Sequence, residues 1–221
     1  DRKASSREPI TARLIANLLE AAGVDRVLSV DLHQGQIQGF FDIPVNHLTA
    51  LYHFGDYFSA KNFDPDTTVV LSPDVGRAKA AKKLGDYLGL PIAIAHKGRP
   101  RHNAAEVMGI IGDIKGKTCI INDDMIDTGG TLVSNIFKLK EMGAGDIYIS
   151  ATHGIFSGEA IDRIEGAPIV ECVITDTIEL PAGREYKKIK QISVAQEIAE
   201  GIYDIFTNKS VSGTSAGKLN L

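Results

Sequence analysis

The residues best suited to chemistry lie in segment 119–131, Cys-Ile-Ile-Asn-Asp-Asp-Met-Ile-Asp-Thr-Gly-Gly-Thr. Its apolar beginning predicts a buried strand, and the apolar spacing after its end predicts a helix. The two glycines between them let the backbone curl until successive N–H groups converge, and the helix adds the positive end of its dipole. We therefore expect a phosphate monoester to be held by Asp127, Thr128, Gly129, Gly130 and Thr131.

An acidic pair, Asp123 and Asp124, precedes this loop. Carboxylates repel phosphate, so these two side chains are expected to accept hydrogen bonds from sugar hydroxyls, or to hold Mg²⁺ through water. An anion site beside an acceptor for a diol suits a pentose 5-phosphate. The alternative is that Asp-Thr-Gly-Gly-Thr merely caps a helix, but a strand that runs into two acidic residues favours a ligand site.

Two further polar residues follow expected strands. His33 comes just after the strand expected at 26–31, where a histidine can contact a ligand or a metal ion. Asp74 follows the strand expected at 68–72, and Gly76 next to it permits close approach of the backbone. The alternative for His33 is an ordinary surface or core histidine. The alternative for Asp74 is a simple turn before a helix.

A group of cations occupies the segment His96-Lys-Gly-Arg-Pro-Arg-His-Asn103. Displacement at phosphorus is catalysed chiefly by positioning and by neutralising charge on the phosphoryl oxygens, and a mobile pair of cations suits this task. Lys97 and Arg99 are the candidates. A run of charges is ordinarily a solvated face, but Lys97 lies next to a strand end.

Strands alternating with helices must position these residues. Strands are expected at 26–31, 68–72, 92–95, 107–111, 118–121, 147–150 and 169–175, and helices at 9–22, 78–88, 131–142, near 160 and at 194–206. Such alternation predicts an α/β fold with a mostly parallel sheet covered on both faces, and ligands at the carboxyl ends of its strands. We expect segment 112–116 to join two of the strands, 107–111 and 118–121, as a hairpin.

The composition excludes several classes of protein. With 43% hydrophobic and 24% charged residues, the 221-residue chain can bury a core. A formal charge of −4 argues against a nucleic-acid partner, and no apolar run approaches the ~20 residues that span a membrane. Cys119 and Cys172 lie in apolar runs, which predicts buried reduced thiols in a cytoplasmic protein.

The strand, acidic pair and Thr-Gly-Gly-Thr loop resemble the signature of the type I phosphoribosyltransferase family. Three more segments resemble the ribose-phosphate pyrophosphokinases within it. They are Ser29-Val-Asp-Leu-His-Gln-Gly-Gln-Ile-Gln-Gly-Phe-Phe-Asp-Ile-Pro44, Val70-Leu-Ser-Pro-Asp-Val-Gly-Arg77, and the cationic segment at 96–103. The second has Asp-Val-Gly-Arg where many family members carry a second glycine, although Arg77 could face a phosphate there.

This resemblance implies an activity. A ribose-phosphate pyrophosphokinase transfers the pyrophosphoryl group of ATP to the 1-hydroxyl of ribose 5-phosphate, which gives 5-phosphoribosyl 1-pyrophosphate and AMP for nucleotide biosynthesis. The resemblance implies Mg²⁺ as the cofactor, ATP and ribose 5-phosphate as the substrates, and a homo-oligomer, a hexamer in the family.

The resemblance also assigns roles to residues. Lys97 and Arg99 would be catalytic, and His33 and Arg2 would bind ATP. His33 and Asp74 would hold the metal ion. Ribose 5-phosphate would be bound by Arg99, Asp123, Asp124, Asp127, Thr128, Gly129, Gly130 and Thr131.

The resemblance predicts a domain organisation as well. Residues 1–50 would be the second half of a phosphoribosyltransferase-like domain whose first half is absent, 51–204 a complete domain of the same kind, and 205–221 a terminal segment and tail. We therefore expect the 221 residues alone not to suffice for catalysis, because the family's adenine pocket depends on residues before Asp1.

Two rival functions are weighed against this one. A phosphoribosyltransferase needs the phosphate loop but neither His33 nor the loop of Lys97 and Arg99 in these contexts. A non-catalytic regulatory subunit of the synthetase tends to lose the catalytic lysine, whereas both cations are present here. The sequence therefore favours the pyrophosphokinase.

Overall fold

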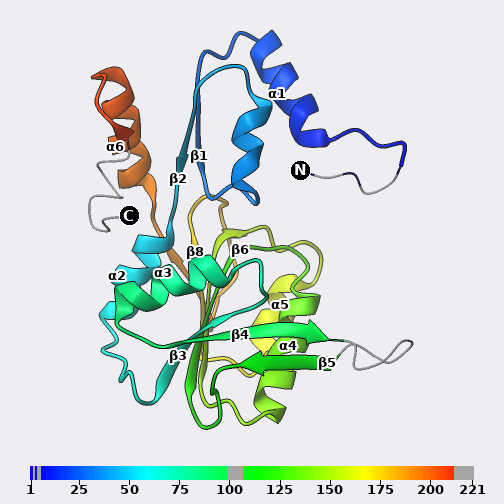
Figure 1. Ribbon diagram of the computed structural model, residues 1–221, viewed down its shortest axis with the longest axis vertical. Coiled ribbons are helices and arrows are strands. Elements are labelled where there is room, and N and C mark those ends of the chain that lie inside the picture. The colour runs from blue at the N-terminus through cyan, green and yellow to red at the C-terminus, as the bar shows by residue number, and fades with distance from the viewer. Residues whose placement is uncertain (2, 4–5, 99–106, 212–221) are drawn as a thin grey trace. The chain divides into compact units, whose positions relative to one another are not determined.

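The computed structural model describes residues 1, 3, 6–98 and 107–211. The chain divides into two compact units (Figure 1). The first unit joins residues 1–50 to the segment from Val194 onward, and the second unit runs from Leu51 to Ser193. Among the residues that the structure describes, no helix combines the length and the apolar character that crossing a membrane requires.

The second unit is built on a seven-stranded sheet of order β5-β4-β3-β6-β7-β8-β9. Every neighbouring pair is parallel except β4 and β5. The strands are β3 (Thr68–Ser72), β4 (Ile92–Gly98), β5 (Val107–Ile111), β6 (Thr118–Ile126), β7 (Ile147–Gly154), β8 (Glu171–Thr175) and β9 (Ile189–Ile192). The predicted mostly parallel α/β architecture is confirmed.

Four helices cover this sheet (Figure 1), namely α2 (Leu51–Ser59), α3 (Ala78–Leu88), α4 (Gly130–Glu141) and α5 (Ala160–Gly166). All five residues of β3 are buried, and successive side chains point to opposite faces. Val69 and Leu71 pack in one cluster with Ile136 and Leu139 of α4. Val70, on the other face, lies beneath Gly85 of α3. The apolar run of β3 is thus explained by helices on both sides.

The strand order changes direction between β3 and β6. From β3 the chain passes through α3 to β4 on one side, whereas from β6 it passes through α4 and α5 to β7 and β8 on the other. Because such connections are right-handed, α3 and the pair α4 and α5 cover opposite faces. A crevice therefore opens beyond the carboxyl ends of β3 and β6, which is where doubly wound sheets bind ligands.

The predicted hairpin between 107–111 and 118–121 is wrong. β5 pairs antiparallel with β4, with Lys97 opposite Met108, and forms the edge of the sheet. β6 lies in the middle, parallel to β3 and β7. Residues Cys119 to Asn122 of β6 are all buried, as expected of a central strand in a parallel sheet that is covered on both faces.

The first unit contains helix α1 (Thr11–Ala21), the 3₁₀ helix η1 (Gly35–Phe40), helix α6 (Ala195–Phe206), and a two-stranded parallel sheet of β1 (Val27–Val30) and β2 (Val45–Leu48). Pro9 precedes α1, and Gly23 follows it with φ 90°. The predicted helix and strand are both present here. β2 was not predicted, because four residues with two polar ones give too short a pattern.

The end of the second unit differs from the sequence prediction. The predicted domain extended to residue 204, whereas the structure groups α6 with residues 1–50. The reason is visible at Gly201 of α6, where a Cβ atom would lie 3.5 Å from side-chain carbons of Leu28 and Leu48. α6 therefore packs on the small sheet of the first unit. Residues 212–221 lie outside the described residues.

Gly85 of α3 provides a test of the packing on the sheet. A Cβ at this position would lie 2.7 Å from Cγ2 of Ile92 and 3.0 Å from the carbonyl oxygen of Leu90. We expect Gly85→Ala to lower the free energy of unfolding by about 1–3 kcal/mol, despite alanine's better helix propensity. Gly166→Ala, where no atom lies within 4 Å, is the control and should change it by less than about 0.5 kcal/mol in urea denaturation. Equal stability changes in the two variants would contradict this packing.

Candidate active site

The loop between β6 and α4 has the backbone shape that its glycines suggested. Gly129 precedes α4 in the left-handed conformation, with φ 69°, and no side chain caps the helix. Within the described part of the chain, the backbone N–H groups of residues 129–132 donate no hydrogen bond. Four unpaired donors at the beginning of a twelve-residue helix form a site suited to an anion.

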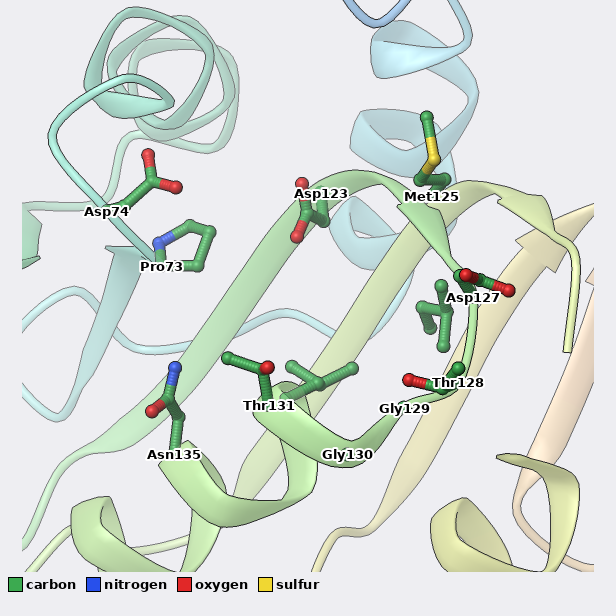
Figure 2. Close-up of a pocket in the computed structure, with 12 residues that line it drawn as sticks. Pro73, Asp74, Asp123, Met125, Asp127, Thr128, Gly129, Gly130, Thr131 and Asn135 are labelled. Atoms are coloured by element: carbon green, nitrogen blue, oxygen red, sulfur yellow. The ribbon is translucent and has the colours of Figure 1, made fainter. Parts of the chain in front are cut away.

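This loop lines a pocket at the switch point of the sheet (Figure 2). Asp74 lies on one side of it, Asp123 stands in the middle, and the segment from Asp127 to Thr131 curves round the other side. Asp74 follows β3 and Asp123 belongs to β6, so the two strand ends that flank the crevice each supply a carboxylate. Asp124 does not line the pocket, but besides Asp74 six of the predicted residues meet here: Asp123, Asp127, Thr128, Gly129, Gly130 and Thr131.

The two members of the acidic pair have different surroundings. Asp123 lines the pocket, whereas Asp124 does not and is only 3% exposed. The backbone N–H of Asp124 donates to Oδ1 of Asp123 at 2.9 Å. The sequence predicted the same roles for both, contact with sugar hydroxyls or with Mg²⁺ through water, but of the two only Asp123 lines the pocket.

The carboxyl group of Asp123 has its pKa raised from 3.8 to about 7. Burial is the main cause, and the side-chain hydrogen bond with Asp124 and the charge of Asp124 act in the same direction. The backbone hydrogen bond from Asp124 and the charge of Arg77 oppose the rise. An ionised Asp123 is thus poorly stabilised by the protein alone.

A turn after β3 brings Arg77 close to the carboxylate of Asp123. Ser72 Oγ donates to the carbonyl oxygen of Asp74 at 2.6 Å, and the Arg77 N–H donates to Oδ1 of Asp74 at 2.9 Å. Nε of Arg77 then lies 3.5 Å from Oδ1 of Asp123. The sequence suggested that Arg77 could face a phosphate, whereas the structure directs its Nε atom to Asp123.

The donors at this pocket fit one particular kind of magnesium site. Among the described residues, no three His, Cys, Asp or Glu side chains gather as a complete set of metal ligands. Mg²⁺ is commonly held by one or two carboxylates together with substrate phosphates and water. Asp74 supplies one exposed carboxylate at the pocket rim, so the residues fit an ion that shares its ligands with a nucleotide.

His33 belongs to the first unit, in the segment between β1 and η1. Asp31 before it adopts a left-handed backbone with φ 41°, which is costly for a non-glycine residue. Hydrogen bonds to side chains help to hold the turn: the Ala50 N–H donates to Oδ2 of Asp31 at 2.9 Å, and the Leu32 N–H donates to Nε2 of His47 at 2.8 Å. This turn fixes the backbone on which His33 is carried.

The remaining predicted residues are Lys97, Arg99 and Arg2. Lys97 is part of β4, which extends to Gly98 rather than ending at residue 95 as predicted. Its backbone pairs with Met108. Arg2 and Arg99 lie outside the described residues.

Comparison with known proteins identifies the family. The family model described as the phosphoribosyl synthetase-associated domain matches residues 86–214. Ribose-phosphate pyrophosphokinase 2 of Enterococcus faecalis is 51% identical over 212 residues, which cover 96% of this chain and 66% of the relative. The ribose-phosphate pyrophosphokinase of Bacillus subtilis is 50% identical with the same coverage. The chain belongs to the ribose-phosphate pyrophosphokinase family.

A solved structure supports the same relationship for the fold. The phosphoribosylpyrophosphate synthetase of Mycobacterium smegmatis superposes with a TM-score of 0.84 at 43% identity, over 94% of this chain and 67% of that one. The chain spans about two thirds of the length of the pyrophosphokinases that it matches.

Sequence reasoning missed several residues at this pocket. Asn135, one turn into α4, and Met125 of β6 line the pocket without belonging to any recognisable motif. Arg163 of α5 reaches the loop from a distance in sequence, where its Nη1 donates to the carbonyl oxygen of Thr128 at 3.0 Å. A single arginine on a short helix is typical of a solvated face, so no sequence signal distinguished it.

The raised pKa of Asp123 predicts a dependence of stability on pH. The folded chain binds this proton more tightly than the unfolded chain, so ionisation lowers the free energy of unfolding as the pH rises from about 4 to about 7. Asp123→Asn should remove this loss. Relative to the wild type, the variant should gain on the order of 4 kcal/mol between about pH 4 and about pH 8 in metal-free urea denaturation. A stability difference that is the same at both pH values would contradict the assignment.

Proposed function

We propose that this protein is a ribose-phosphate diphosphokinase, which makes 5-phosphoribosyl 1-pyrophosphate and AMP from ribose 5-phosphate and ATP. The observation that carries the proposal is the joining, in one pocket, of unpaired backbone donors with the carboxylates of Asp123 and Asp74. The donors suit a phosphate, and carboxylates near them suit hydroxyl groups and a cation. Relatives of this name at 50–51% identity support the same reading.

In the proposed complex the loop holds the 5-phosphate of the sugar. The N–H groups of residues 129–132 and the hydroxyls of Thr128 and Thr131 would donate to its oxygens. Asp123 would accept a hydrogen bond from a ring hydroxyl, and the buried Asp124 would act through its contact with Asp123. The sugar would then be fixed at both ends, which limits the orientations of its 1-hydroxyl.

ATP would lie on the Asp74 side of the pocket, and Asp74 would hold Mg²⁺, which when bound would neutralise charge on the nucleotide phosphates. The family resemblance further proposes His33 as a ligand of ATP and of Mg²⁺, and Arg2 as a ligand of ATP. The 1-oxygen of ribose 5-phosphate would form a bond to the β-phosphorus and release its proton. The bond from the β-phosphorus to the bridging oxygen would break, and AMP would leave with that oxygen.

Lys97 and Arg99 would stabilise the charge that develops during this transfer. Lys97 lies at the carboxyl end of β4, which is the same edge of the sheet as the ends of β3 and β6 because all three strands are parallel. We further propose a cytoplasmic enzyme, since both of its substrates are cytoplasmic metabolites and its two cysteines are buried free thiols. The homo-oligomer implied by the family is proposed as well.

The phosphate loop gives one test. Thr128→Phe and Gly129→Val should block the donors and weaken binding of ribose 5-phosphate by about tenfold or more in calorimetry, with little change for ATP. Gly158→Val is the matched control, because Gly158 also has a positive φ, 61°, but belongs to neither the loop nor the pocket. Equal losses for both ligands would count against this assignment of the loop.

The cations give a test of the reaction itself. The full-length protein should release AMP only when Mg²⁺, ATP and ribose 5-phosphate are all present. Lys97→Ala and Arg99→Ala should lower kcat by roughly 10²-fold or more with smaller effects on KM, as for the loss of donors to a transition state.

Two outcomes would refute this proposal. Near-normal turnover in both variants would remove the catalytic role of the cations. Consumption of 5-phosphoribosyl 1-pyrophosphate with a nucleobase, without any formation of AMP from ATP, would instead identify a phosphoribosyltransferase.

A further inference from the structure

Arg163 approaches the phosphate loop from a separate helix. It lies on α5, and its Nη1 donates to the carbonyl oxygen of Thr128 at 3.0 Å. The same atom lies 3.8 Å from the position that a Cβ atom would take at Gly130, the first residue of α4. The backbone of α5 also supports the loop, since Ala160 lies 3.8 Å from the corresponding position at Gly129. The guanidinium group is therefore part of the wall behind the loop.

The electrostatics of this position are unfavourable without an anion. The N-terminal end of a helix carries a positive partial charge, so a cation there is repelled by the helix dipole. The ion partner of Arg163 is Glu159, with Nη2 and Oε2 3.3 Å apart, and the Glu159 side chain is 79% exposed. An exposed pair of this kind gives little compensation. A phosphate at the loop would be attracted by the dipole and by Arg163 together.

The hydrogen bond from Arg163 to Thr128 also sets the direction of the Gly129 N–H group. A peptide group is planar and trans, so the N–H of Gly129 points opposite to the C=O of Thr128. When Arg163 holds that carbonyl oxygen toward α5, the Gly129 N–H is turned away from α5. Gly129 has no Cβ and a φ of 69°, so its peptide could rotate easily without this constraint. Arg163 thus orients the first of the unpaired donors in the loop.

We propose that Arg163 is a positioning residue for the phosphate group of ribose 5-phosphate. It fixes the peptide between Thr128 and Gly129 and adds positive potential behind the donors. This inference rests on the proposed function, because it assigns a further residue to the same phosphate site.

The test uses the full-length protein with Arg163→Ala, Arg163→Gln and Arg163→Lys. Calorimetry measures the Kd for ribose 5-phosphate and for ATP, and steady-state kinetics separate KM from kcat. Arg184→Ala is the matched control, since Arg184 pairs with Asp162 of the same helix at 2.6 Å but does not contact the loop. Melting temperatures identify any variant that fails to fold, and the three substitutions keep the test open if one of them does.

Arg163→Ala should raise the Kd and the KM for ribose 5-phosphate by about tenfold to a hundredfold, as for the loss of a charge-assisted hydrogen bond. The values for ATP should change less than about twofold. Arg163→Lys, which keeps the positive charge and can still donate to the Thr128 carbonyl oxygen, should recover most of the affinity, and Arg163→Gln should recover less. Higher salt should narrow the difference between wild type and Arg163→Ala.

Three results would overturn the inference. Arg163→Ala could bind ribose 5-phosphate within twofold of the wild type, or Arg163→Gln could equal Arg163→Lys. Ribose 5-phosphate and ATP could also be weakened equally, which would indicate a general structural role. Failure of the wild type itself to bind ribose 5-phosphate would refute the proposed function, and so the two failures are distinguishable.

Discussion

The right-handedness of strand–helix–strand connections is the constraint on which the candidate site depends. The chain leaves β3 toward one edge of the sheet and leaves β6 toward the other, so their helices must cover opposite faces. The loops that follow these two neighbouring strands therefore separate, and a crevice remains between them. Asp74, Asp123 and the glycine loop all border that crevice, although about fifty residues divide the two loops in sequence.

Within the crevice, groups of opposite charge lie close together without neutralising one another. Burial and Asp124 raise the pKa of Asp123 to about 7, and the nearby Arg77 only partly opposes this. On the other side, the backbone N–H groups of residues 129–132 donate no hydrogen bond within the described part of the chain, and the guanidinium group of Arg163 lies behind them, donating to the carbonyl oxygen of Thr128. We infer that a ligand with both a phosphate and hydroxyl groups would stabilise both sides at once: its hydroxyls would donate to the Asp123 carboxylate, and its phosphate would accept from the unpaired N–H groups.

The two sides of the pocket differ in how they are supported. The turn after β3 is closed by local hydrogen bonds from Ser72 and Arg77, and it needs little from the rest of the chain. The loop after β6 depends on helix α5, which is distant in sequence. Ala160 of α5 lies against Gly129, and Arg163 of α5 donates to the carbonyl oxygen of Thr128. Changes in α5 are therefore expected to affect the phosphate side of the pocket more than the Asp74 side.

Patterns of neighbouring residues were enough to predict the local elements of this protein. The apolar runs of β3 and β6, the helical spacing of α3 and α4 and the glycines before α4 predicted these elements and the shape of the phosphate loop, because each depends on residues close together in the chain. Which elements are neighbours became visible only in the folded chain. It paired β5 with β4, grouped α6 with the first unit, buried Asp124, directed Arg77 to Asp123 and brought Arg163 to Thr128. These contacts join residues that are distant in sequence, and their free energy depends on burial and on neighbouring charges, which exist only after the sheet and its helices have packed together.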